Sequence, residues 1–205
     1  MTTNRTPKTQ ARIMQATLEC ILQQGIRATS TVNIAKQAGV SRGALVHHYP
    51  TKASLMEAAM KDLLDREVES VRETAKRVEE GTLEFETLLD MLHEHFNGDL
   101  FMVTLEFLTA ARTDESVKKV LVPLAKQFNE SLEAIWENLV SNTQHSEHEN
   151  RVALNATLCM MRGMASQSIW RDDPELRRDM MLFWKQTLIN AGFSSKTSSS
   201  VRERI

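Results

Sequence analysis

Ser41, Arg42, Ala44 and His47 lie close together in the sequence, directly after the tripeptide Ala38-Gly39-Val40. A guanidinium and an imidazole can donate hydrogen bonds to phosphate oxygens and to the edges of bases. The types and spacing of these side chains therefore predict contacts with a nucleic acid.

Two short helices must position these side chains. Ser30 or Thr31 can cap a helix that continues to residue 38, and Ser41 can cap a second helix that Pro50 stops. Between them, Gly39 supplies a residue that reaches positive φ without steric cost. Residues 30–48 therefore have the layout of a helix-turn-helix, in which the first turns of the second helix read base edges in the major groove.

The charge of the chain is unevenly distributed. Residues 1–56 hold seven lysines and arginines but one acidic residue, Glu19, which gives this segment a net charge of +6. The remaining residues hold 18 basic and 26 acidic side chains, a net charge of −8, so the chain as a whole carries −2. Because binding responds to the local potential, the basic segment suits a polyanionic partner.

The sequence resembles the TetR family of bacterial transcriptional regulators over about residues 8–56. The resemblance rests on Gly25, on Ala28-Thr29-Ser30, on Ile34-Ala35, on residues 38–45 (AGVSRGAL), and on residues 48–52 (HYPTK) with Leu55. It implies a homodimer on double-stranded operator DNA, with the helix after the turn in the major groove and with Tyr49 and Lys52 on phosphates. The predicted DNA-binding residues are Ser30, Thr31, Ser41, Arg42, Gly43, Ala44, His47, His48, Tyr49 and Lys52.

Three positions depart from the family pattern. Val46 and His47 stand where the family often has two aromatic residues, and Val32 stands where a base-contacting arginine is frequent. His47 and His48 could each donate to phosphate, or one of them could face the core of the domain. The sequence leaves open which of the two faces DNA.

The fold class is predicted to be all-α, with about nine helices and no segment of strand-like alternation. Helices are expected over residues 7–24, 30–38, 41–48, 51–80, 82–97, 99–112, 114–141, 147–170 and 174–190, with a kink or short break at Pro123. Three parts are predicted: a DNA-binding domain over residues 1–56, a helical effector-binding and dimerisation domain over 57–193, and a disordered tail over 194–205.

Two surfaces are predicted in the C-terminal domain. By the resemblance, its last two helices pair with their mates in a dimer; the candidate interface residues are Ala156, Gly163, Met180, Trp184 and Leu188. The resemblance also implies an effector pocket in this domain, and one for a small apolar or amphipathic effector is expected among Met91, Phe96, Met102, Phe107, Trp136, Met160 and Met164. For both sets the alternative is burial in the core of the same subunit.

Several function classes are excluded by what the sequence lacks. No phosphate-binding glycine loop, nucleophile elbow or paired catalytic carboxylates occur, so no enzyme activity and no cofactor are expected. His93 with His95, and His145 with His148, lack ligand spacing for a metal site. Two isolated cysteines and the absence of an apolar span or signal peptide predict a cytoplasmic protein without membrane contact.

The resemblance implies a ligand-responsive repressor that binds a pseudo-palindromic operator as a homodimer, because repression is the common mode of that family; the residues themselves leave repression and activation open. Effector binding would shift the helix over residues 51–80 and so change the separation of the two DNA-binding domains. The alternative is a helical adaptor that binds protein and has no sequence-specific affinity for DNA.

Overall fold

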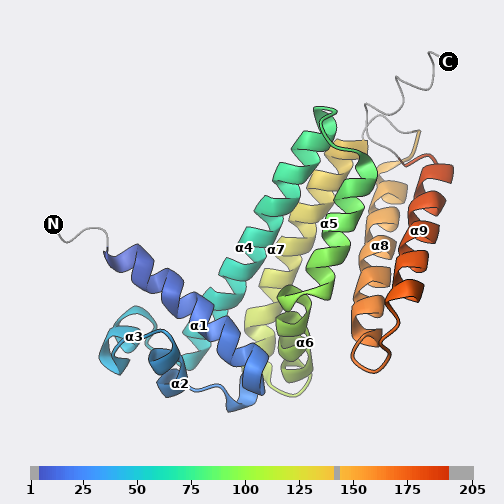
Figure 1. The fold of residues 1–205 in the computed structure, drawn as a ribbon. Coiled ribbons are helices and arrows are strands. Elements are labelled where there is room, and N and C mark those ends of the chain that lie inside the picture. Colours follow the sequence, from blue (N-terminus) through green and yellow to red (C-terminus); the bar gives the residue numbers. More distant parts are fainter. Residues whose placement is uncertain (1–4, 141–143, 194–205) are drawn as a thin grey trace. The chain divides into compact units, whose positions relative to one another are not determined.

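The structure is a computed structural model that describes residues 5–140 and 144–193; the predicted tail, residues 194–205, lies outside the described residues. Within the described part the chain is all-α and forms nine helices (Figure 1). They are α1 (Arg5–Ala28), α2 (Thr31–Gln37), α3 (Arg42–His48), α4 (Lys52–Glu79), α5 (Phe85–Asn97), α6 (Asp99–Ala111), α7 (Glu115–Val140), α8 (Glu147–Gln167) and α9 (Pro174–Asn190). None of these helices is long and apolar enough to span a membrane.

The predicted helix boundaries are confirmed to within a few residues, with two differences. Helix α7 continues through Pro123 as one helix, so the expected short break is absent. The last turn of α1 extends past Gly25, but Gly25 itself is non-helical, with φ of 77° and ψ of 161°. The first helix was predicted to end at residue 24, and the structure has a kink at the next residue, Gly25.

Two compact units divide the described chain differently from the predicted domains. The first unit comprises residues up to Arg66 together with Met102–Gln127, and the second comprises Glu67–Phe101 with the residues from Phe128 onward. Long helices α4 and α7 each contribute one segment to either unit. The first unit thus holds the helix-turn-helix and also most of α6 and the start of α7.

The core of the first unit includes the face of α1 that the sequence predicts. Ile13, Ala16, Thr17, Cys20 and Ile21 are each at most 4% exposed, as the spacing of one buried helix face requires. Helix α1 packs on α2, and α2 on α3 (Figure 1). A hydrogen bond of 2.7 Å from the Gln37 side chain to the Glu19 carboxylate also links α1 to α2.

In the second unit, helix α5 packs against α8, and α8 against α9 (Figure 1). The stripe predicted for α5 is confirmed, because Phe85, Leu88, Leu89, Leu92 and Phe96 are all buried. Ser146 and Glu149 form a capping box that fixes the start of α8.

Candidate nucleic-acid interface

The turn between α2 and α3 has the geometry predicted from the sequence. Gly39 has a φ of 61°, and the side-chain oxygens of Ser30 and Ser41 accept hydrogen bonds from the backbone N–H groups of Asn33 and Ala44. Both serines are therefore N-caps, and each satisfies a backbone N–H group in the first turn of its helix.

Helix α3 is anchored on one side and exposed on the other. Leu45 is fully buried, whereas Ser41, Arg42, Gly43, Val46 and His47 are exposed and Ala44 is partly exposed. The predicted DNA-binding residues of α3 thus lie together on its solvent side. An exposed guanidinium, an imidazole and an apolar side chain on one helix face can contact phosphates, base edges and thymine methyl groups.

His47 and His48 differ in exposure: His47 is exposed, and His48 is half-buried, with its ring 5.6 Å from that of His47 and 6.3 Å from that of Tyr49. Tyr49 is also half-buried at the end of α3. Burial and the nearby Asp62 carboxylate raise the pKa of the Tyr49 phenol. His47 is therefore the histidine with more of its surface open to a ligand.

Helix α2 contributes to the same solvent side. Thr31 is half-exposed at its first turn, and Val32, Asn33 and Lys36 are exposed, with Val32 at 55%. Val32 thus presents an apolar side chain to solvent at the position where the sequence resemblance implies an arginine.

Arg12, which the sequence reasoning missed, holds the turn from behind. Its guanidinium donates to the backbone oxygens of Ala38 and Gly39, at 3.1 Å for Gly39. The arginine thus satisfies carbonyls at the end of α2, where the helix leaves them without partners. Arg12 and Ala38 are 26 positions apart, and no local sequence pattern predicts a contact over that separation.

Lys52 does not point freely into solvent. Residue Lys52 as a whole is exposed, but its Nζ donates a 2.9 Å hydrogen bond to the carbonyl of Ile26, and desolvation lowers the pKa of the ammonium. The N–H of Ile26, released from the helix by the kink at Gly25, donates to the Glu106 carboxylate at 3.0 Å. Lys52 on α4 thus binds the carbonyl of Ile26, and Glu106 on α6 binds its N–H.

The residues predicted to bind an effector fall in both compact units. Met102 and Phe107 belong to the first unit; Met91, Phe96, Trp136, Met160 and Met164 belong to the second. Met102 is 40% exposed, while Phe96, Phe107, Trp136 and Met164 are buried and Met91 and Met160 are intermediate.

Trp136 lines a cavity of about 10 Å³ in the second unit, together with Leu88, Leu92, Leu132 and other apolar side chains. Such a volume holds about one water molecule and no effector. Within the described residues the buried indole N–H of Trp136 has no hydrogen-bond acceptor, and the Trp136 ring lies 5.6 Å from that of Phe85. A larger ligand at this position requires the surrounding helices to move apart.

The residues predicted for the dimer interface separate into two groups. Ala156 and Gly163 are exposed on α8. By contrast, Leu188 is 3% exposed, and the indole N–H of Trp184 donates to the buried Thr157 hydroxyl at 2.9 Å. Leu188 is thus buried within the subunit, and half-buried Trp184 is bonded to α8 of the same subunit.

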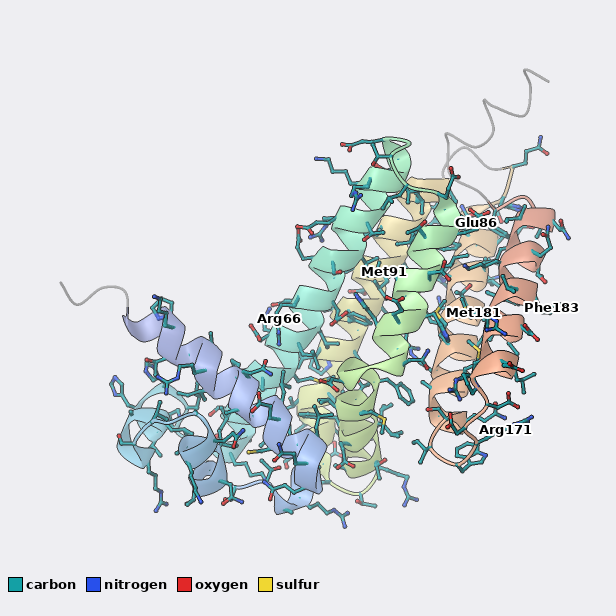
Figure 2. The ribbon with its side chains drawn as sticks, viewed as in Figure 1. Arg66, Glu86, Met91, Arg171, Met181 and Phe183 are labelled. Atoms are coloured by element: carbon teal, nitrogen blue, oxygen red, sulfur yellow. The ribbon has the colours of Figure 1, made fainter. Side chains whose placement is uncertain are left out.

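The outer side of α9 carries apolar residues that the sequence reasoning did not select. Leu182 and Phe183 are 57% and 71% exposed, and Val152 on α8 is 52% exposed. Figure 2 shows Phe183 on the side of α9 away from α8, whereas Met181, which is buried, lies between the two helices. Met180 is half-exposed beside them.

The histidines that could suggest a metal site have other partners. His95 Nδ1 lies 2.6 Å from a Glu67 carboxylate oxygen, His93 contacts the Asn97 amide, and His145 contacts the Ala191 carbonyl and stacks on Phe193. Within the described residues no group of three or more potential ligands is placed to hold a metal ion.

Part of the chain matches a known protein family, and longer stretches match individual regulators. Residues 13–59, which span most of α1 and all of α2 and α3, match the model of bacterial regulatory proteins of the tetR family. The HTH-type transcriptional regulator CymR of Pseudomonas putida is 26% identical over 171 residues, which cover 83% of this chain and 84% of CymR. An uncharacterized HTH-type regulator of Mycobacterium tuberculosis is 31% identical over 125 residues, 61% of this chain and 64% of that protein.

Solved structures share the fold at low sequence identity. The crystal structure of a TetR-family regulator from Mesorhizobium loti has a TM-score of 0.71 at 14% identity, covering 91% of this chain and 98% of that one. The multidrug binding protein EbrR, complexed with imidazole, has a TM-score of 0.58 at 20% identity over 85% and 93% of the two chains. These likenesses extend to the C-terminal helices, beyond residues 13–59 that the family model matches.

Proposed function

Because the chain belongs to the TetR family of bacterial transcriptional regulators, a family of DNA-binding proteins that are not enzymes, we propose that it is a homodimeric, ligand-responsive repressor in the cytoplasm. The single observation that carries the proposal is the exposed face of α3, with Arg42, Val46 and His47 beside the N-cap Ser41. This face enters the major groove, and α2 flanks it at the phosphate backbone.

The exposed side chains indicate which contacts are made. Arg42 donates to a guanine edge or to a phosphate, and His47 donates to a phosphate. The two exposed valines, Val32 and Val46, can pack on thymine methyl groups, which substitutes apolar readout for the polar contacts common in the family. Tyr49 and His48 are half-buried and support α3. They reach the phosphate backbone of the DNA only at the edge of the interface.

Dimerisation follows from the geometry of DNA. Two reading helices must sit about 34–36 Å apart to enter successive major grooves of a pseudo-palindrome, so two copies of the chain are needed. The exposed apolar side chains of α8 and α9, notably Phe183, supply a surface that a second copy would bury.

A small-molecule effector completes the proposal. EbrR, a structural neighbour, is described as a multidrug binding protein, which supports a small ligand in this fold. Binding of the ligand shifts the population toward a conformation in which the separation of the two DNA-binding domains no longer matches successive major grooves, and the operator is released.

The experiment is selection of binding sites from a random DNA pool by the purified full chain, followed by affinity measurement on the selected site at two salt concentrations. The expected result is an inverted repeat whose affinity falls steeply with salt. An enriched sequence without symmetry would contradict the dimeric mode. Retention of no sequence, or binding indifferent to salt, would contradict DNA recognition and support the helical adaptor instead.

A further inference from the structure

The first compact unit contains a cavity of about 690 Å³ beside the kinked end of α1. Its walls come from Ile26 and Arg27, the start of α4, the second half of α6, and the connection from α6 into α7. This volume lies within the range of pockets for small organic molecules. None of the sequence-predicted effector residues except Phe107 lines it.

The floor of the cavity is apolar. Ile26, Met56, Phe107 and Ala110 are buried, and Val117 and Val120 are half-buried around them. Burial of an aromatic or aliphatic group on this floor would remove apolar surface from water, which stabilises a complex. The floor thus favours a ligand with a compact apolar body.

The rim carries two cations whose hydrogen-bond partners are neutral. Lys52 Nζ donates to the Ile26 carbonyl at 2.9 Å, and the Arg27 guanidinium donates to the Thr113 hydroxyl at 3.2 Å. In the described part of the chain, neither cation has a carboxylate within ion-pair distance. Both therefore retain capacity for a charged acceptor.

The two carboxylates on the same rim are already engaged. Asp114 accepts from the backbone N–H and the hydroxyl of Ser116, at 2.9 and 2.6 Å, and from the N–H of Val117. Glu115 lies 3.9 Å from the ammonium of Lys118. Both carboxylates thus have partners within their own segment, and Asp114 also interacts electrostatically with Arg27 beyond ion-pair distance. The rim charges that keep hydrogen-bond donors for an added anion are Lys52 and Arg27.

We propose that this cavity binds an amphipathic organic anion: an apolar ring or chain on the Ile26–Phe107 floor, with a carboxylate on Lys52 and Arg27. A carboxylate is a stronger acceptor for an ammonium than a backbone carbonyl is, so it competes with Ile26 for Lys52. The anion then loosens one of the two bonds that hold Ile26, at the point where α1 leads into α2.

The consequence for DNA rests on the proposed function, whereas the site itself rests on the cavity and its charges. Loosening at Ile26 gives α2 and α3 more orientational freedom, so the anion weakens operator binding. Lys52, which resemblance assigns to a phosphate, then belongs to the ligand site.

The probe is 2-naphthoate, with naphthalene-2-carboxamide as its uncharged isostere, titrated calorimetrically into the full chain without DNA. We expect the carboxylate to bind about tenfold more tightly than the carboxamide. K52M and R27M should each reduce the ratio of the two affinities toward one. K61M changes an exposed residue of α4 outside the cavity and should leave the ratio unchanged. V120W, which places a bulky indole in the cavity wall, should weaken binding of both compounds.

Circular dichroism and thermal unfolding identify any variant that fails to fold, and R27M alters only an exposed side chain. Equal affinity for the two compounds in the wild-type chain, no binding at millimolar concentration, or an unchanged ratio in folded K52M and R27M would overturn the site. A second arm measures the salt dependence of DNA binding. If K52M lowers the slope of log K against log salt by about one, Lys52 contacts a phosphate and the assignment is overturned. Binding of 2-naphthoate by a chain that retains no DNA would support the site and refute only the proposed function.

Discussion

The carboxylate of Glu106 accepts a 3.0 Å hydrogen bond from the backbone N–H of Ile26, a residue 80 positions earlier in the chain. The N–H needs this acceptor because the kink at Gly25 takes it out of the helical ladder of α1. A Cβ added to Gly25 would lie 3.0 Å from the same carboxylate, so the glycine permits both the backbone conformation and the close approach of α6.

Replacement of Glu106 by alanine should destabilise the chain, since a largely buried N–H loses its acceptor. We expect the free energy of unfolding to fall by about 1–3 kcal/mol. Urea denaturation of E106A measures the effect. E106Q keeps an acceptor oxygen and should lose clearly less; equal losses in both variants would show that the charge, and not the hydrogen bond, matters here.

Gly39 should be intolerant of a side chain. Its φ is 61°, and a Cβ there would lie 2.7 Å from a guanidinium nitrogen of Arg12, which itself caps α2. G39A is therefore expected to lower the free energy of unfolding by about 1–2 kcal/mol. G43A is the matched control, because Gly43 is helical and its nearest contact is 3.9 Å away. That change should stabilise the chain by about 0.5–1 kcal/mol. A neutral G39A would refute the assigned turn geometry.

His95 and Glu67 should make stability depend on pH. The Glu67 carboxylate, within hydrogen-bond distance of Nδ1 though off line with its N–H, raises the pKa of His95, and burial opposes this. A raised pKa in the folded state means that the pair stabilises the chain fully below the unfolded pKa of about 6.5 and ceases to do so as pH rises through the folded pKa.

H95Q should therefore lose more unfolding free energy at pH 6 than at pH 9, with a difference on the order of 1 kcal/mol. His93 provides the contrast, because burial lowers its pKa and the folded state disfavours its protonation. H93Q should then gain stability relative to the wild type as pH falls below about 6.5. Denaturation curves at both pH values check the signs; a pH-independent loss in H95Q would show that the ion pair contributes nothing.

Phe183 should be central to the subunit contact. A phenyl ring 71% exposed on the outer side of α9 would be buried by a second copy, and a carboxylate there would be stranded without a partner. F183E is expected to sediment as a monomer at micromolar concentration, with the helix content of the wild type. L108E, on the exposed side of α6, should remain dimeric. Dimeric F183E, or a monomeric wild type, would remove this interface.

The sequence predicted local structure well because local rules determine it. The side-chain oxygens of Ser30 and Ser41 cap the helices that follow them, and the turn between those helices requires a positive φ at Gly39. The periodicity of α1 and α5 identifies their buried faces. Arg12 and Glu106 were missed because their acceptor and donor lie 26 and 80 residues away, and no periodicity reports such a pairing.

The chemistry of the C-terminal residues was harder to predict for the same reason. Methionine and aromatic residues at helical spacing are equally suited to a core and to a pocket, so Phe96 and Trp136 could not be distinguished from structural residues. On α9, hydrophobic spacing selected Leu188, which is 3% exposed, and did not select Phe183, which is 71% exposed.

Arg42, at the exposed start of α3, offers the sharpest test of whether this helix reads DNA. We would measure, by fluorescence anisotropy, the affinity of R42A for the selected operator and for a scrambled duplex. R72A is the charge-matched control, since Arg72 pairs with Glu69 on α4, outside the helix-turn-helix. We predict that R42A loses about 1–3 kcal/mol on the operator and much of its preference over the scrambled duplex, while R72A behaves as the wild type. Equal effects of the two substitutions, or an R42A chain with full affinity and preference, would contradict the claim that α3 reads DNA.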